Sequence, residues 1–246
     1  MLNRFARALF TRLFTPVARA LLRLGVSPDV VTVVGTLGVC AGALIFYPTG
    51  HFVIGTLVIS GFVFSDTLDG VMARLSGRPS KWGAFLDSSL DRVGDAAIFS
   101  GLILWYLGRG DDMLTGGLAL ACLVFGSLVS YVRAKAEGIG LKADVGIAER
   151  AERLVATLLA TGLVGWFLPD VVLTVVLAVL AVASAVTVVQ RLLYVRKQAL
   201  AAGEVRARSR LVLPEAGQHE HHEHDEPAAP GAGSRPAPAE STSQDA

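Results

Sequence analysis

Four aspartates at helical spacing mark the stretch from residue 66 to residue 91. Asp66 and Asp69 are three residues apart and Asp87 and Asp91 are four apart, so each pair shares one face of a helix. Apolar runs lie directly before and after the stretch, where an ionisable side chain costs roughly 2.5 to 3.5 kcal/mol at a helix centre. Two facing helices with two carboxylates each could offset that cost by holding divalent cations. Ligands that are all oxygen favour Mg²⁺ or Mn²⁺ over zinc or copper.

Small residues stand beside these acids. Gly70 and Ala73 fall on the same helix face as Asp66, and Gly83 precedes Asp87 by one turn. Small side chains let a ligand or a second helix approach closely. The alternative is a set of structural salt bridges at a membrane edge, which does not require glycines at these offsets. Its basic partners would be Arg74, Arg78, Lys81 and Arg92.

The whole stretch resembles the signature of the CDP-alcohol phosphotransferase family, D-x-x-D-G-x-x-A-R, eight residues, then G-x-x-x-D-x-x-x-D. All of its defining residues are present at the expected spacing: Asp66, Asp69, Gly70, Ala73, Arg74, Gly83, Asp87 and Asp91. The resemblance implies an enzyme that moves a phosphatidyl group from CDP-diacylglycerol to an alcohol and releases CMP. It also implies two metal ions on the four aspartates, with Asp91 as the base that accepts the proton of the alcohol.

The same resemblance predicts the residues that bind CDP-diacylglycerol. They comprise a segment before the first apolar run together with part of the signature: Asp29, Val30, Val31, Thr32, Asp66, Asp69, Gly70, Ala73, Arg74 and Ser80. Gly70 has a physical reason, because a side chain there would fill space that the nucleotide needs. For Asp29 to Thr32, the alternative of a simple helix cap stays open.

Basic residues near the ends of later apolar runs suggest a second anion site. The sequence around Ser130–Gly138 and Gly146–Arg153 resembles the actinobacterial phosphatidylinositol phosphate synthases. That resemblance implies an acceptor-phosphate pocket formed by Arg133, Lys135, Arg153 and Arg191. The alternative role for such residues is to set membrane topology and contact anionic lipid headgroups.

Hydropathy indicates the elements that must position these residues. The chain has 246 residues, of which 52% are hydrophobic and 17% are charged, and its mean hydropathy is +0.55. These values predict an all-α polytopic membrane protein with six transmembrane helices, since each apolar run is near the length that spans a bilayer. The predicted spans are 30–47, 52–74, 84–107, 114–135, 150–167 and 171–194. Arginines interleaved with leucine and phenylalanine over residues 1–25 predict an amphipathic interfacial helix.

The basic residues also predict the orientation. Of the 22 Lys and Arg residues, only Arg109 falls at the turns after spans one, three and five. The positive-inside rule then places both termini and the aspartates on the cytoplasmic side of the cell membrane. Residues 26–200 are the predicted catalytic domain. Residues 201–246, rich in Ala, Pro, Glu, Ser and Gly, are predicted to be a disordered cytoplasmic tail.

The expected activity is transfer to 1D-myo-inositol 3-phosphate (L-myo-inositol 1-phosphate) in phospholipid biosynthesis, giving phosphatidylinositol phosphate. Glycerol 3-phosphate is the alternative acceptor, because it also carries a phosphate. A cation transporter is the alternative from another class, but it would spread its acids through the bilayer depth. The resemblance further implies a homodimer among membrane lipids, and we expect no nucleic acid partner. Cys40 and Cys122 lie in apolar runs and are interpreted as small core residues.

Overall fold

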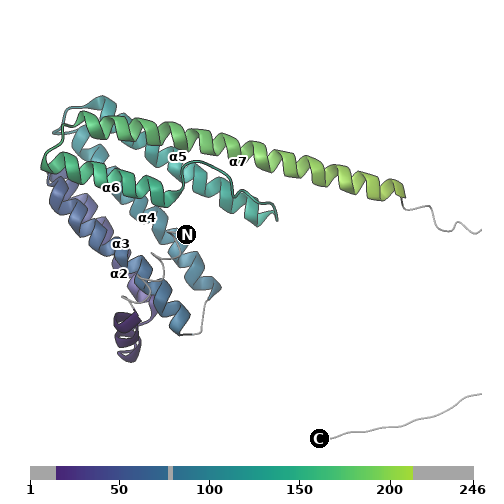
Figure 1. Cartoon of the computed structure of the whole chain (residues 1–246), viewed down its shortest axis with the longest axis horizontal. Helices are drawn as coiled ribbons and strands as arrows, with labels where there is room; N and C mark the ends of the chain where they lie inside the picture. The colour runs from purple at the N-terminus through teal and green to yellow at the C-terminus, as the bar shows by residue number, and fades with distance from the viewer. Residues whose placement is uncertain (1–14, 77–79, 213–246) are drawn as a thin grey trace, which may run out of the picture. The chain divides into compact units, whose positions relative to one another are not determined.

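The computed structural model describes residues 15–76 and 80–212, without the side chains of residues 64–67 and 204–212. Within these residues the secondary structure is entirely helical, which confirms the predicted fold class at that level. After a helical segment at residues 15–23, the elements are α2 (Pro28–Phe46), η1 (Tyr47–Thr49), α3 (Phe52–Leu75), α4 (Lys81–Tyr106), α5 (Met113–Gly138), α6 (Arg150–Trp166) and α7 (Val171–Val212) (Figure 1). Of the described residues, those up to 203 form one compact unit, and 204–212 belong to a second.

Side-chain caps start most of these helices. Ser27 caps α2 by accepting from the Val30 amide at 3.3 Å, and Pro28 occupies the first turn. Ser80 caps α4 through the Gly83 amide at 2.8 Å. Asp112 caps α5, and a reciprocal pair of Glu149 and Glu152 caps α6. Each cap satisfies amide groups that have no partner inside the helix, so the helix starts are fixed locally by sequence.

In the part of the chain that the structure describes, four helical segments are long and apolar enough to cross a membrane: Pro28–Thr49, Phe52–Leu75, Met113–Gly138 and Val171–Gly203. The two other predicted spans differ from these. The α4 helix carries five charged residues, among them Asp87 and Asp91, and α6 has only 17 residues. Length and composition therefore support four spans directly.

The last helix is longer than the sequence predicted. Hydropathy ended the sixth span near Tyr194 and assigned residues 201–246 to a disordered tail, but α7 continues to Val212. The segment from 201 to 212 contains alanine, arginine and glutamate, which favour helix without being apolar. A hydropathy boundary marks the end of a possible membrane span and not the end of a helix. Residues 1–14 and 213–246 lie outside the described residues, as does Arg78.

Small residues let α2 pack closely against its neighbours. A Cβ on Gly42 would lie 3.0 Å from the Val58 side chain of α3, and a Cβ on Gly101 of α4 would lie 2.5 Å from the carbonyl oxygen of Ala43. The small-residue run at 35–42 therefore serves packing within this chain. This close approach brings the start of α2 beside the end of α3 and the start of α4.

The segment at residues 15–23 packs on the same end of the bundle. Ala18 is fully buried in a cluster with Val71 and Met72 of α3. Arg19 and Arg23 are exposed on this short helix. The segment thus has one face on the end of α3 and basic residues on the other.

Candidate functional site

A cavity of about 550 Å³ opens where α2, α3 and α4 meet. Small and polar residues from all three helices and from the caps of α2 and α4 form its wall: Ser27, Pro28, Asp29, Thr32, Asp69, Gly70, Ala73, Ser76, Ser80, Gly83, Ala84 and Asp87. Most are residues singled out from the sequence, and they come from both halves of the aspartate stretch and from the start of α2. The structure thus brings segments about 40 residues apart into one wall.

A hydrogen bond from α2 fixes the side chain of Asp69, which lies on α3. Its Oδ2 accepts a hydrogen bond from Thr32 Oγ1 at 2.5 Å, and both residues are buried. The Thr32 hydroxyl also lies 3.1 Å from the carbonyl oxygen of Pro28, one turn back on α2. A buried carboxylate needs such a donor, because its charge would otherwise be poorly solvated. Thr32 therefore orients one carboxylate of the cavity wall.

The glycines of the stretch keep the cavity open. A Cβ added to Gly70 would meet only Nη1 of Arg74, at 3.9 Å, so that position faces space that a side chain would occupy. Gly83 is different, because its Cβ would lie 3.0 Å from Ser80 Oγ and 3.5 Å from Asp29 Oδ1. Gly70 leaves room for a ligand, while Gly83 allows α4 to approach the start of α2.

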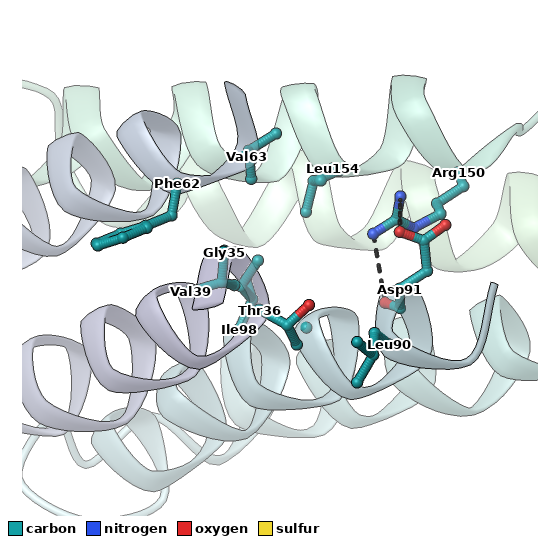
Figure 2. Close-up of a pocket in the computed structure, with 11 residues that line it drawn as sticks. Gly35, Thr36, Val39, Phe62, Val63, Leu90, Asp91, Ile98, Arg150 and Leu154 are labelled. Atoms are coloured by element: carbon teal, nitrogen blue, oxygen red, sulfur yellow. Dashed lines mark hydrogen bonds and ion pairs between the residues drawn. The ribbon is translucent and has the colours of Figure 1, made fainter. Parts of the chain in front are cut away.

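Asp91 lies one turn beyond Asp87 and has a different environment. Its Oδ1 is 2.8 Å from Nη1 of Arg150, the first residue of α6. Figure 2 shows this pair at the edge of a small second cavity, of about 20 Å³, that is otherwise mainly apolar. The Asp91 side chain is 18% exposed. The last aspartate of the stretch thus lies beside a cation at the smaller cavity, one turn from Asp87 on the wall of the larger one.

The residues suit a divalent cation in donor type and in placement. Asp69 from α3 and Asp87 from α4 line one cavity, and every donor in the set is an oxygen, as hard cations prefer. Among the side chains that the structure describes, no three Asp, Glu, His or Cys residues converge closely enough to hold an ion. The side chain of Asp66 lies outside the described residues. Binding of metal by Asp66, Asp69, Asp87 and Asp91 stays a prediction with a suitable donor set.

The predicted donor-binding residues divide into two groups. Those that line the large cavity are Asp29, Thr32, Asp69, Gly70, Ala73 and Ser80. Of the others, Val30 and Arg74 are exposed, and Val31 packs on the cluster around Met72. Ser27, Pro28, Ser76 and Ala84 line the cavity although the sequence did not single them out as site residues. Ser76 lies two residues after Arg74, in the eight-residue spacer of the signature, and that proximity was the available signal.

The four predicted acceptor-site residues have unequal environments. Arg153 and Arg191 are buried, at 2% and 4% exposure, whereas Lys135 is exposed. Arg133 is half exposed and pairs with Glu137 at 2.9 Å and Asp144 at 3.1 Å. Arg191 lies within electrostatic reach of both Arg133 and Arg153. Three of the four thus form one cationic region from α5, α6 and α7.

Arg191 also has a structural role. Its Nε donates to the carbonyl of Val145 at 2.8 Å, and Nη1 donates to the carbonyl of Val129 at 2.7 Å. Gln198 exchanges two hydrogen bonds with the backbone of Lys142. Side chains of α7 therefore hold residues 139–149, the segment between α5 and α6, by hydrogen bonds. Arg150 and Arg153 follow this segment at the start of α6.

Comparison with known proteins assigns the chain to a family. The family model for CDP-alcohol phosphatidyltransferases matches residues 25–190. The match includes the cavity wall and both acid pairs, and it ends just before Arg191.

Curated relatives share both sequence and length with this chain. A phosphatidylinositol phosphate synthase of Streptomyces avermitilis is 54% identical over 204 residues, covering 80% of this chain and 84% of that protein. One from Cutibacterium acnes is 51% identical over 205 residues, covering 80% and 98%.

Solved structures agree with this assignment. The phosphatidylinositol phosphate synthase of Mycobacterium tuberculosis, crystallised with CDP-DAG bound, is 43% identical and aligns with a TM-score of 0.73, covering 75% of this chain and 94% of that one. Its complex with manganese and citrate gives a TM-score of 0.72 at 43% identity, covering 74% and 88%. With a family model over most of its length and relatives above half identity, the chain belongs to the CDP-alcohol phosphatidyltransferase family.

Proposed function

We propose that this protein is a phosphatidylinositol phosphate synthase. It transfers the phosphatidyl group of CDP-diacylglycerol to 1D-myo-inositol 3-phosphate and releases CMP. The observation that carries this proposal is the cavity whose wall combines Asp69, Gly70 and Asp87 with the start of α2. The curated relatives named for this activity, at 54% and 51% identity, support the choice of acceptor.

The donor nucleotide belongs in the large cavity. Gly70 leaves its wall open, and Asp29, Thr32, Ala73 and Ser80 supply polar or small contacts there. Arg74 sits one turn beyond Gly70, where its charge can offset that of the pyrophosphate. The acyl chains of the donor remain in the bilayer, and only its headgroup enters the polar cavity.

Mg²⁺ is the proposed cofactor, as two ions held by Asp66, Asp69, Asp87 and Asp91. Manganese in the mycobacterial synthase structure supports the choice of a hard divalent ion. When bound, the metal would neutralise charge that builds on the pyrophosphate oxygens. In this chain Thr32 orients Asp69 for that role through the 2.5 Å hydrogen bond.

Asp91 is the proposed base. The attacking hydroxyl of inositol phosphate loses its proton as the new P–O bond forms, and Asp91 accepts that proton while CMP leaves with the electrons of the broken P–O bond. A carboxylate within hydrogen-bond reach can do this although it is a weak base. Arg150 Nη1 lies 2.8 Å from Oδ1 of Asp91, and this contact holds the carboxylate that accepts the proton. The described residues include one histidine, His51, next to the η1 turn at the far end of α2, so it is not a rival base.

The acceptor phosphate belongs with the cationic region of Arg133, Arg153 and Arg191, and the exposed Lys135 is the fourth proposed contact. Arginine presents a planar fork that suits phosphate. Arg153 is the strongest candidate, because its buried Nη1 has no hydrogen-bond partner among the described residues. A buried unsatisfied donor is costly, and a phosphate oxygen would satisfy it.

The membrane arrangement is proposed on the same basis. Six helices, α2 to α7, cross the membrane, with residues 1–25 at the interface and 26–200 as the catalytic domain. Both termini and the cavity face the cytoplasm, because basic residues cluster at that end. The predicted tail, residues 201–246, lies on the cytoplasmic side, with 213–246 outside the described residues, and the protein works as a homodimer in the plasma membrane.

The deciding experiment measures acceptor-dependent CMP release by purified protein with CDP-diacylglycerol and Mg²⁺. Inositol phosphate and glycerol 3-phosphate are supplied in parallel. Release with inositol phosphate alone supports the proposal. Release with glycerol 3-phosphate alone would keep the family and the cavity but move the function to phosphatidylglycerol phosphate synthesis. A cation transporter would release no CMP at all, and membership of a transferase family already weighs against it.

A further inference from the structure

Asp95 is an acidic residue that the signature does not include. It lies one turn beyond Asp91 on the same face of α4. Its side chain is 14% exposed, which is low for a carboxylate among apolar helices. A charge in such a place requires partners, and the structure supplies two from α6.

Arg150 is the first of these partners. Its Nε lies 3.1 and 3.3 Å from the two carboxylate oxygens of Asp95, and its Nη2 lies 3.1 Å from Oδ1. The same guanidinium reaches Asp91 through Nη1 at 2.8 Å from Oδ1, and its Nη2 donates to the Asp91 carbonyl at 3.3 Å. All three nitrogens are used, so the position of Arg150 depends on both carboxylates. Arg150 therefore bridges Asp95 and the proposed base, and Figure 2 shows its contact with Asp91.

Arg153 is the second partner. Its Nη2 lies 3.5 Å from Asp95 Oδ2, a longer contact than those of Arg150. The guanidinium is accommodated by Gly126 of α5, where a Cβ would lie 2.9 Å from Cζ. Nη1 is buried and without a hydrogen-bond partner among the described residues. Arg153 thus retains capacity for an anion while it is loosely paired with Asp95.

Asp95 is therefore shared by two arginines. Arg153 is the proposed phosphate ligand, and Arg150 holds the proposed base, Asp91. An anion on Arg153 would compete with Asp95 for that guanidinium. Asp95 would then be left to Arg150 alone, and the Arg150 bridge to Asp91 would tighten. The coupling needs no movement of a helix, because only the balance of two ion pairs changes.

We propose that Asp95 is a positioning residue: through Arg150 it sets the orientation of the Asp91 carboxylate, and by sharing its charge with Arg153 it links that orientation to the acceptor phosphate. This inference rests on the proposed function, in which Asp91 takes the proton and Arg153 takes the phosphate. Asp95 itself touches no substrate.

The test uses Asp95→Asn in the full-length protein, with CMP release measured against CDP-diacylglycerol and inositol phosphate. We expect kcat to fall by about 10- to 100-fold, because a displaced base loses its geometry. We expect KM for inositol phosphate to stay unchanged or to fall, since the carboxylate that competes with phosphate for Arg153 is weakened. We expect KM for CDP-diacylglycerol to stay unchanged. Asp95→Glu, which keeps the charge, should recover part of kcat.

A lower kcat with an unchanged or lower KM for inositol phosphate distinguishes a positioning role from a general loss of helix packing. A kcat near that of the parent, or a KM for inositol phosphate that rises in step with the loss of kcat, overturns the proposal. Asp170→Asn is the matched control, because that carboxylate also holds a hydrogen bond, from the Tyr106 hydroxyl at 3.2 Å, far along the helices from the site. If the parent protein releases no CMP with any acceptor, the proposed function fails instead.

Removing one member of a buried ion pair can prevent folding, so a second variant is required. Arg150→Lys keeps one positive charge but cannot bridge two carboxylates with a planar fork. We expect the same pattern, a kcat lowered by about tenfold or more with KM for inositol phosphate unchanged. If Arg150→Lys has the kcat of the parent, the proposed link from Asp95 through Arg150 to Asp91 is wrong, whatever the result with Asp95→Asn.

Discussion

The Thr32 hydroxyl donates to Oδ2 of Asp69 at 2.5 Å, joining the first turn of α2 to the end of α3. One residue comes from a segment that reads as a helix cap, and the other is a predicted metal ligand. Outer partners that orient a ligand carboxylate commonly change metal affinity by about 10- to 100-fold. The bond therefore gives the start of α2 a role in the predicted metal site, while Ser27 caps the helix.

Replacing Thr32 by valine tests that role. Valine keeps the shape but removes the donor, so we expect Mn²⁺ affinity to fall by about 10- to 100-fold, measured by electron paramagnetic resonance titration. Thr32→Ser should retain most of the affinity. Thr56→Val is the control, because its hydroxyl pairs with Tyr47 at 3.0 Å at the other end of the bundle. Equal metal binding in Thr32→Val and the parent would show that Asp69 needs no such support.

Metal removal gives the second prediction. A chelator should abolish CMP release, and added Mg²⁺ or Mn²⁺ should restore it, since the donor pyrophosphate needs its charge neutralised. Asp87→Asn should weaken Mn²⁺ binding by about tenfold or more without loss of thermal stability, because Asp87 is exposed on the cavity wall. Asp111→Asn, in the turn between α4 and α5, should match the parent. Full activity in the chelator would exclude a metal-dependent mechanism.

The predicted helices agree with the structure where side chains cap them or apolar runs define them. The second span was predicted as 52–74 and is observed as Phe52–Leu75. The third was placed from residue 84, but α4 begins at Lys81 because Ser80 caps it. The signature likewise identified Asp69, Gly70 and Asp87 on the cavity wall, since helical spacing depends only on local geometry.

Contacts between distant helices were beyond the reach of the sequence. Arg150 was predicted only as the first residue of the fifth span, yet it pairs with Asp91 and Asp95. The spacing of Asp95 one turn after Asp91 was a signal, but nothing in one sequence indicates that α6 begins beside that face of α4. The roles of Val30 and Val31 were carried over from a family resemblance of the whole segment 29–32, whereas neighbouring side chains of a helix point in different directions, and Val31 packs on the cluster around Met72.

Asp91→Asn gives the third prediction. The amide keeps the shape but cannot accept the proton of the alcohol, so kcat should fall by at least about 100-fold. Binding of CDP-diacylglycerol should remain, because Asp91 lies beside the smaller cavity rather than among the residues that line the larger one. Turnover and donor binding are measured on the same preparation. Lost binding would mean that Asp91 chiefly supports the fold or the donor site.

Deletion of residues 213–246 gives the fourth prediction. The shortened chain retains every helix through Val212. Because the deleted composition does not favour a packed structure, activity in detergent should stay nearly unchanged. A large loss would contradict the interpretation of a disordered tail and would assign it a part in assembly or catalysis.

Variants of the acceptor-site residues should be of two kinds: those that change only KM for inositol phosphate and those that also lower the melting temperature. Lys135 is exposed, so Lys135→Ala should raise KM for inositol phosphate without lowering the melting temperature. Arg191 donates to the carbonyls of Val145 and Val129, and each buried acceptor left unpaired costs about 1 to 3 kcal/mol. Arg191→Ala should therefore raise the same KM and also lower the melting temperature, by roughly 3 to 10 °C. Gln198→Ala, which releases the same segment at Lys142 without removing a charge, is the comparison. If it raises KM for inositol phosphate as much as Arg191→Ala does, the arginine acts by holding the segment, and contact with the phosphate is not needed to explain its effect.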